Sequence, residues 1–197
     1  MKKTKRVAFK ESKWGGLIFL FYLGGALSSV IPEENVRILI VNLTIATVLS
    51  LLMLLIWKIH QNDSKRYFSL ASYIMMISFG FFASIPILRE FIGTLYFWII
   101  IGLLLLIILP THLFREQMLR FILRPYKYGL FGKLFLIIPI FIGYFGSYVW
   151  VVSVAFYREV NNLGLLGSLA FFGLSTIFLF LAPIMLNKQE EVERIEK

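Results

Sequence analysis

The sequence has 197 residues, a formal net charge of +9 and no cysteine. Hydrophobic residues make up 59% of it, whereas a soluble domain is about 45 to 50% apolar even when glycine is counted. The composition therefore excludes a soluble globular protein, and the absence of cysteine excludes disulfides, thiolate metal sites and a cysteine nucleophile.

Six uncharged windows, each without Asp, Glu, Lys or Arg, recur along the chain. The shortest holds 19 residues and the longest 28, and a hydrocarbon core of roughly 30 Å needs about 20 residues of helix. We therefore predict an all-α fold, a single bundle of six transmembrane helices over residues 14–187. The predicted spans are 14–32, 38–57, 67–88, 91–114, 134–157 and 160–187.

The N-terminal residues 1–13 form a basic tail, and residues 188–197 form a charged tail at the other end of the chain. Cytoplasmic loops retain Lys and Arg, and short translocated loops do not. Of the 20 basic residues, 17 fall in the two tails and the second and fourth connections. Only Arg37, Arg89 and Arg158 fall in the other three connections. This asymmetry predicts a bacterial-type cytoplasmic membrane protein with both termini in the cytoplasm.

Because the basic residues flank the spans, they predict contact with anionic lipid headgroups and not with nucleic acid. No folded soluble module is present to display a nucleic-acid surface. We expect membrane lipids and a membrane or cytoplasmic protein as the partners.

Asn42 is the only amide well inside an uncharged window. A buried Asn in a membrane helix commonly bridges two helices and stabilises them by about 0.6 to 2 kcal/mol. The alternative is a ligand contact. In that case the companions of Asn42 would come from the outer half of span 134–157, which carries Tyr144, Tyr148 and Trp150.

Two Arg-Glu pairs stand at the predicted outer boundary of the membrane. Arg89 precedes Glu90, and Arg158 precedes Glu159. Neighbouring opposite charges are less costly at an interface than a lone charge, so structural pairing is the first interpretation. The alternative is that Arg89 or Arg158 clamps an anionic ligand at the outer mouth.

The connection after span 91–114 is amphipathic between Glu116 and Arg124. Polar side chains cluster on one helical face and Met118, Leu119 and Phe121 take the other, with Pro125 ending the helix. We predict a short interfacial helix here. It serves either as an anchored connection or as a docking surface for acidic lipid or a cytoplasmic partner, through Arg115, Arg120, Arg124 and Lys127.

Close helix approach is predicted where small residues lie four apart, because packing drives helix association in lipid. Gly24 with Ser28, Gly143 with Ser147, and Gly164 with Ser168 have this spacing.

Catalytic and metal constellations are missing from the sequence. Asp63 is the single Asp, and His60 and His112 are the only histidines, so paired-Asp membrane enzymes are excluded and no metal or cofactor is expected. We predict a non-enzymatic ligand-binding or transport-associated membrane subunit. The alternative is an accessory, immunity or regulatory protein that acts through helix-helix contacts.

In length, span count and orientation, this layout is similar to that of the substrate-binding subunits of energy-coupling-factor importers. The resemblance concerns the layout alone. We expect the ligand site to open outward among spans 38–57, 134–157 and 160–187, near Asn42, Tyr144 and Tyr148, and the protein to depend on partner proteins for energy.

Overall fold

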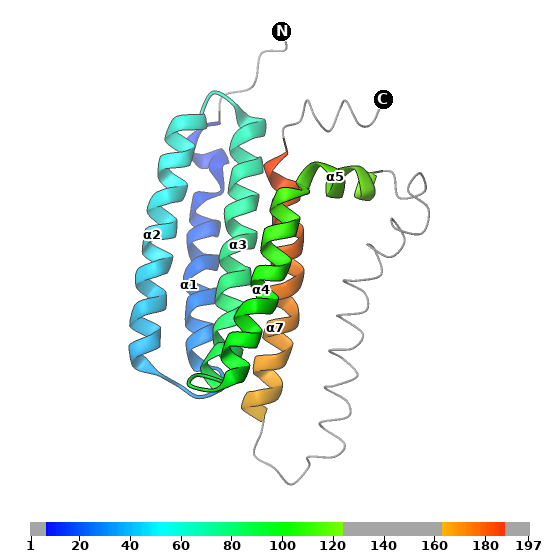
Figure 1. The fold of residues 1–197 in the computed structure, drawn as a ribbon. Helices are drawn as coiled ribbons and strands as arrows, with labels where there is room; N and C mark the ends of the chain where they lie inside the picture. The colour runs from blue at the N-terminus through cyan, green and yellow to red at the C-terminus, as the bar shows by residue number, and fades with distance from the viewer. Residues whose placement is uncertain (1–6, 124–162, 188–197) are drawn as a thin grey trace.

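The computed structural model describes residues 7–123 and 163–187, and every element in these residues is a helix (Figure 1). The described elements, in chain order, are η1 (Phe9–Ser12), α1 (Trp14–Val30), α2 (Val36–His60), α3 (Ser64–Glu90), α4 (Leu95–Leu113), α5 (Arg115–Leu123), α7 (Leu163–Leu181) and η3 (Ala182–Leu186).

Five of the described helical stretches are long and apolar enough to cross a membrane: Phe9–Val30, Val36–His60, Ser64–Glu90, Leu95–Leu113 and Gly164–Leu186. They correspond to five of the six predicted spans, so a bundle of apolar helices long enough to span a membrane is confirmed. The predicted span 134–157 lies outside the described residues. Helix α4 begins four residues after the start of its window because Phe91–Thr94 form a turn, in which Gly93 has a φ of +80°.

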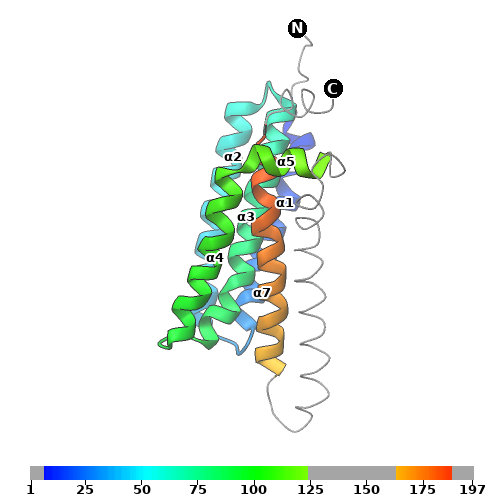
Figure 2. The same ribbon diagram turned by 45° about the vertical axis from the view of Figure 1, so that its right-hand side comes forward.

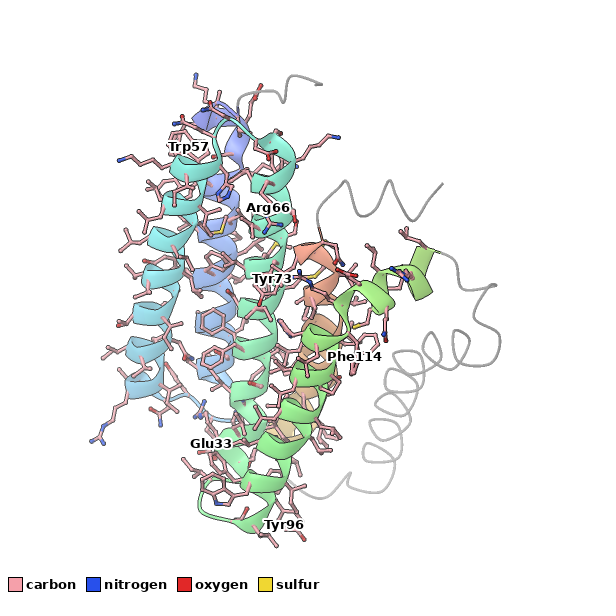
Figure 3. All side chains as sticks on the ribbon, turned by 45° about the horizontal axis from the view of Figure 1, so that its top comes forward. Glu33, Trp57, Arg66, Tyr73, Tyr96 and Phe114 are labelled. Atoms are coloured by element: carbon pink, nitrogen blue, oxygen red, sulfur yellow. The ribbon has the colours of Figure 1, made fainter. Side chains whose placement is uncertain are left out.

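The long helices run up and down, so that their connections gather at two ends (Figure 1). The short helix η1, the α2–α3 connection, α5 and η3 lie at the upper end in this view. The α1–α2 connection, the α3–α4 turn and the start of α7 lie at the lower end. Figure 3 shows Trp57 and Arg66 toward the first end, and Glu33 and Tyr96 toward the second.

The predicted amphipathic helix is present as α5. Met118 and Leu119 are buried, while Glu116, Gln117 and Arg120 are exposed. Helix α5 leaves the direction of α4 and crosses over the end of α7, where it contacts η3 (Figure 2). Its first carbonyl, that of Arg115, accepts a hydrogen bond from Asn187 Nδ2 at 3.5 Å.

Helix α3 is the centre of the bundle and packs against α1, α2 and α7. Its closest approach is to α7 at Gly80, where an added Cβ would lie 2.6 Å from Leu179 Cγ. Ser175 Oγ donates to the Gly80 carbonyl at 2.6 Å and joins the two backbones at the same level. Only a residue without a side chain fits this seam.

Small residues in α1 also allow close packing, as their spacing predicted. A Cβ on Gly24 would lie 3.3 Å from the Phe82 ring, and one on Gly25 would lie 3.3 Å from the Asn42 carbonyl oxygen. Gly143 and Ser147 lie outside the described residues.

Residues 7–13 pack onto the bundle, and we name them the N-terminal strap. The Val7 N–H donates to the Gln61 carbonyl at 2.7 Å, and Trp57 Nε1 donates to the Val7 carbonyl at 3.2 Å. Tyr67, which is fully buried, donates its hydroxyl to the Ser12 carbonyl at 2.7 Å. The second half of the predicted basic tail is thus held against the bundle by the buried residues Val7 and Ser12.

Candidate functional site

A cavity of about 520 Å³ opens at the end of the bundle where α1 joins α2 and α3 joins α4. This volume lies within the range of about 300 to 1,000 Å³ that is typical of small-molecule sites. The described residues that line it come from three separate parts of the chain: Pro32, Glu33, Asn35, Ile38, Arg89, Glu90, Ile92, Gly164 and Leu165. We name it the Arg89 pocket.

Arg89 lies in the last turn of α3 and reaches across to the end of α1. Its Nη1 donates to the carbonyls of Ser29 at 3.0 Å and Ile31 at 2.8 Å, and is 3.4 Å from that of Ser28. Its Nη2 donates to the Glu33 carbonyl at 2.7 Å. The last carbonyls of a helix have no partner within the helix and carry partial negative charge. The guanidinium therefore caps α1 and joins it to α3.

This arrangement differs from the pairing that the sequence suggested. The hydrogen bonds of Arg89 go to backbone carbonyls and not to the neighbouring Glu90. An Arg that is held in this way has fewer N–H groups left for a ligand, because a guanidinium has five in all.

The carboxylates of Glu33 and Glu90 are the other charged groups that line the Arg89 pocket, and both side chains are exposed. Asn35 caps α2, because its Oδ1 accepts a hydrogen bond from the Ile38 N–H at 3.2 Å. Ile38, Ile92 and Leu165 supply apolar surface. The pocket thus combines charged groups of both signs with apolar wall, which suits a small polar molecule.

Asn42 lies outside the Arg89 pocket and is 1% exposed. Its Nδ2 donates to the hydroxyls of Ser28 and Ser29, each at 2.9 Å, and is 3.3 Å from the Gly25 carbonyl. Both hydroxyls in turn donate to that carbonyl, at 3.0 and 2.7 Å. The contacts of Asn42 are those of a bridge between α2 and α1.

The other residues that the sequence singled out are spread over the chain. Arg115 and Arg120 lie on α5, at the end opposite the Arg89 pocket. The structure therefore brings neither of them to Arg89. Outside the described residues lie Arg124, Lys127, Tyr144, Tyr148, Trp150 and Arg158.

Sequence reasoning missed most of the pocket wall, namely Pro32, Glu33, Asn35 and Ile38 from one connection and Gly164 and Leu165 from α7. Asn35 directly before an apolar run is a helix-start signal that could have drawn attention to this connection. Gly164 packs against it, since an added Cβ would lie 2.7 Å from Pro32 Cβ. The spacing of Gly164 and Ser168 predicted a close approach, but the sequence does not show that the partner of Gly164 is Pro32.

A second polar contact joins α3 to α4 nearer the other end. His112 Nδ1 lies 2.8 Å from the Ile108 carbonyl oxygen, and its Nε2 lies 3.0 Å from the Tyr73 hydroxyl. Because a carbonyl only accepts, Nδ1 carries the proton, and in a neutral imidazole Nε2 then accepts from the Tyr73 hydroxyl. His112 thus has a structural role as a link between two helices.

The described residues contain no group of three or more His, Cys, Asp or Glu side chains that could hold a metal ion. No family model matches the chain, and no curated protein and no solved structure matches it.

Proposed function

We propose that the protein binds a small polar molecule in the Arg89 pocket, as a ligand-binding or transport-associated membrane subunit that works with partner proteins. The observation that carries this proposal is the pocket itself, a cavity of about 520 Å³ at one end of an apolar helical bundle. Its polar wall favours a ligand that arrives from water over one that arrives from the hydrocarbon core.

The proposed orientation puts this pocket on the outer side. Of the 20 basic residues, 17 belong to the two tails and to the second and fourth connections, and cytoplasmic loops retain such residues. Those that the structure describes, such as Lys58, Arg66 and Arg115, lie on elements at the end opposite the Arg89 pocket. A ligand would then enter from outside the cell, as in an importer.

The proposal includes a sixth span at residues 134–157. Helix α4 ends at one end of the bundle and α7 begins at the other (Figure 1), so the chain between them has to return over the same thickness. The uncharged window there holds 24 residues, which as a helix would span about 36 Å. Cysteines introduced singly at Lys127 and Arg158 should therefore react with an impermeant reagent from opposite sides. Labelling from the same side would overturn the sixth span.

We include partner proteins in the proposal because the sequence has no phosphate-binding glycine loop that could couple transport to nucleotide hydrolysis. The proposed docking surface for a cytoplasmic protein partner is helix α5 with the basic residues in and after it, Arg115, Arg120, Arg124 and Lys127. The layout shared with energy-coupling-factor substrate-binding subunits is consistent with such dependence.

A second candidate is an accessory or regulatory protein that acts through helix-helix contacts, and one observation favours it. Only 11% of the residues in the apolar window of α4 are buried, compared with 50% of those in the window of α3. Large side chains such as Trp98, Leu106 and Leu113 are exposed along it. A partner helix could pack there in place of lipid.

The test is a ligand screen by thermal stability on the purified protein and on a Leu165→Trp variant, which adds a bulky ring at the wall of the Arg89 pocket. A Leu106→Trp variant on the exposed face of α4 is the control. We expect a polar ligand that stabilises the wild type and the control but not Leu165→Trp. Equal stabilisation of all three proteins, or none by any polar metabolite, would contradict ligand binding at this pocket.

Mass spectrometry of proteins that co-purify from native membranes separates the two candidates. Recovery of an ATPase subunit favours the transport-associated role, whereas a membrane protein that is lost on Leu106→Arg substitution favours the accessory role.

A further inference from the structure

Three aromatic rings meet where the N-terminal strap reaches the end of α2. The Phe9 ring lies 5.4 Å from that of Trp14 and 5.1 Å from that of Trp57, measured between ring centroids. Each ring belongs to a residue next to a lysine in the sequence: Lys10 follows Phe9, Lys13 precedes Trp14 and Lys58 follows Trp57. We name these six residues the basic aromatic patch.

The lysines of this patch are all exposed, and so is Phe9, at 47%. Glu11, which is also exposed, is the acidic residue of the same short helix. Three lysines against this one carboxylate leave a local excess of positive charge beside partly exposed aromatic surface.

The patch is built by the fold and is not the property of a loose tail. Val7, which is 2% exposed, is held through both its N–H and its carbonyl by the end of α2. Ser12 is fully buried and is held by Tyr67 of α3. Trp14 Nε1 donates to the Ser50 carbonyl at 3.3 Å, which fixes the third ring. These contacts bring Lys10 and Lys13 to the same end of the bundle as Lys58.

We propose that the basic aromatic patch is a binding site for the headgroup of an anionic phospholipid. Aromatic rings of Trp and Phe place a surface at the depth of the headgroups, and lysines near that depth attract anionic lipid. The patch combines both features at the boundary of three apolar helices, α1, α2 and α3. The proposal does not depend on ligand binding in the Arg89 pocket, and it uses the proposed orientation only to assign the lipid to the cytoplasmic leaflet.

The test is native mass spectrometry of the full chain in detergent, with dioleoylphosphatidylglycerol and dioleoylphosphatidylcholine as the competing probes. Replacing Lys10, Lys13 and Lys58 by Gln should reduce the preference for phosphatidylglycerol about a hundredfold, because three positive charges that attract anionic lipid are lost. The matched control replaces Arg115, Arg120 and Lys127 by Gln, which removes the same number of charges from the α5 region. It should leave most of the preference in place.

A Phe9→Ala variant keeps every lysine and removes the ring that joins Trp14 to Trp57. We expect it to lose part of the preference, about threefold, because the lysines are then no longer held together. Equal loss in the patch variant and the α5 control would mean that overall charge attracts the lipid, and would overturn the site. An unchanged preference in the patch variant, with wild-type thermal stability, would overturn it as well.

Discussion

The two ends of the bundle use their charged side chains in opposite ways. At the Arg89 pocket, the guanidinium donates hydrogen bonds to carbonyls at the end of α1, and an open cavity lies beside it. At the strap, neutral groups close the end: Val7 and Gln61 pair through their backbones, and Tyr67 satisfies Ser12. The lysines there stay exposed. At the pocket end, the charged Arg89 is held by hydrogen bonds that close the end of α1. At the strap end, neutral groups make the closing hydrogen bonds, and the charged lysines stay exposed to their surroundings.

The largest loss of stability is expected from Arg89→Ala. It leaves carbonyls at the end of α1 without their donor, and it should lower the free energy of unfolding in detergent by about 3 kcal/mol, since hydrogen bonds from charged groups contribute about 1.5 to 3 kcal/mol. Arg37→Ala removes an exposed Arg near the same end and should change stability by less than about 0.5 kcal/mol. Similar losses in both variants would mean that Arg89 does not hold α1 to α3.

Gly80→Ala tests the close approach of α3 and α7, the two helices that meet at Gly80. The added Cβ would meet Leu179 at 2.6 Å, so we expect a loss of about 2 kcal/mol from overpacking. Gly102→Ala on α4 is the matched control, because no atom lies within 4 Å of its added Cβ. Gly80→Ala should unfold at a lower temperature than Gly102→Ala. A Gly80→Ala protein as stable as the control would contradict the close approach of the two helices.

Closure of the strap end by neutral groups is tested by Tyr67→Phe. This change removes one buried hydroxyl and leaves the Ser12 carbonyl without its donor, at an expected cost of about 1 to 2 kcal/mol. Tyr22→Phe is the control, because its hydroxyl pairs with that of Thr47 in an exposed position. Hydrogen exchange at residues 7–13 should rise in Tyr67→Phe and stay unchanged in Tyr22→Phe. Equal exchange in both would show that Tyr67 does not hold the strap.

The smallest effect is expected from Asn42→Ala, about 1 kcal/mol, the usual size for one interhelical polar contact in a membrane. Because Asn42 lies outside the Arg89 pocket, the affinity of any ligand found for that pocket should remain within about twofold of the wild type. A tenfold weaker affinity in an Asn42→Ala protein that still folds would contradict this prediction and show that Asn42 contributes to ligand binding.

Apolar helices were predictable because span length and charge spacing are local properties of the sequence. Five windows become helices, and the short helix after Pro110 follows its 3.6-residue period. The partners of the polar residues were less accessible. Arg89 and Glu90 are adjacent in sequence, yet the guanidinium reaches Ile31 and Glu33 on another helix. Gly80 and Ser84 have the small-residue spacing, but the sequence does not show that the neighbour of Gly80 is Leu179 of α7. The strap was predicted to be a charged tail because the residues that Val7 and Ser12 contact lie about 50 residues further along the chain.

In the proposed orientation, the Arg89 pocket faces the outside and the basic aromatic patch faces the cytoplasm. The chain has no cysteine, so a single introduced cysteine reports one position without background. Ile92→Cys marks the pocket end, where the side chain is 72% exposed, and Lys10→Cys marks the strap. In intact cells, a membrane-impermeant maleimide should label Ile92→Cys directly and Lys10→Cys only after permeabilisation. Labelling of both from the same side, or in the reverse order, would contradict the account.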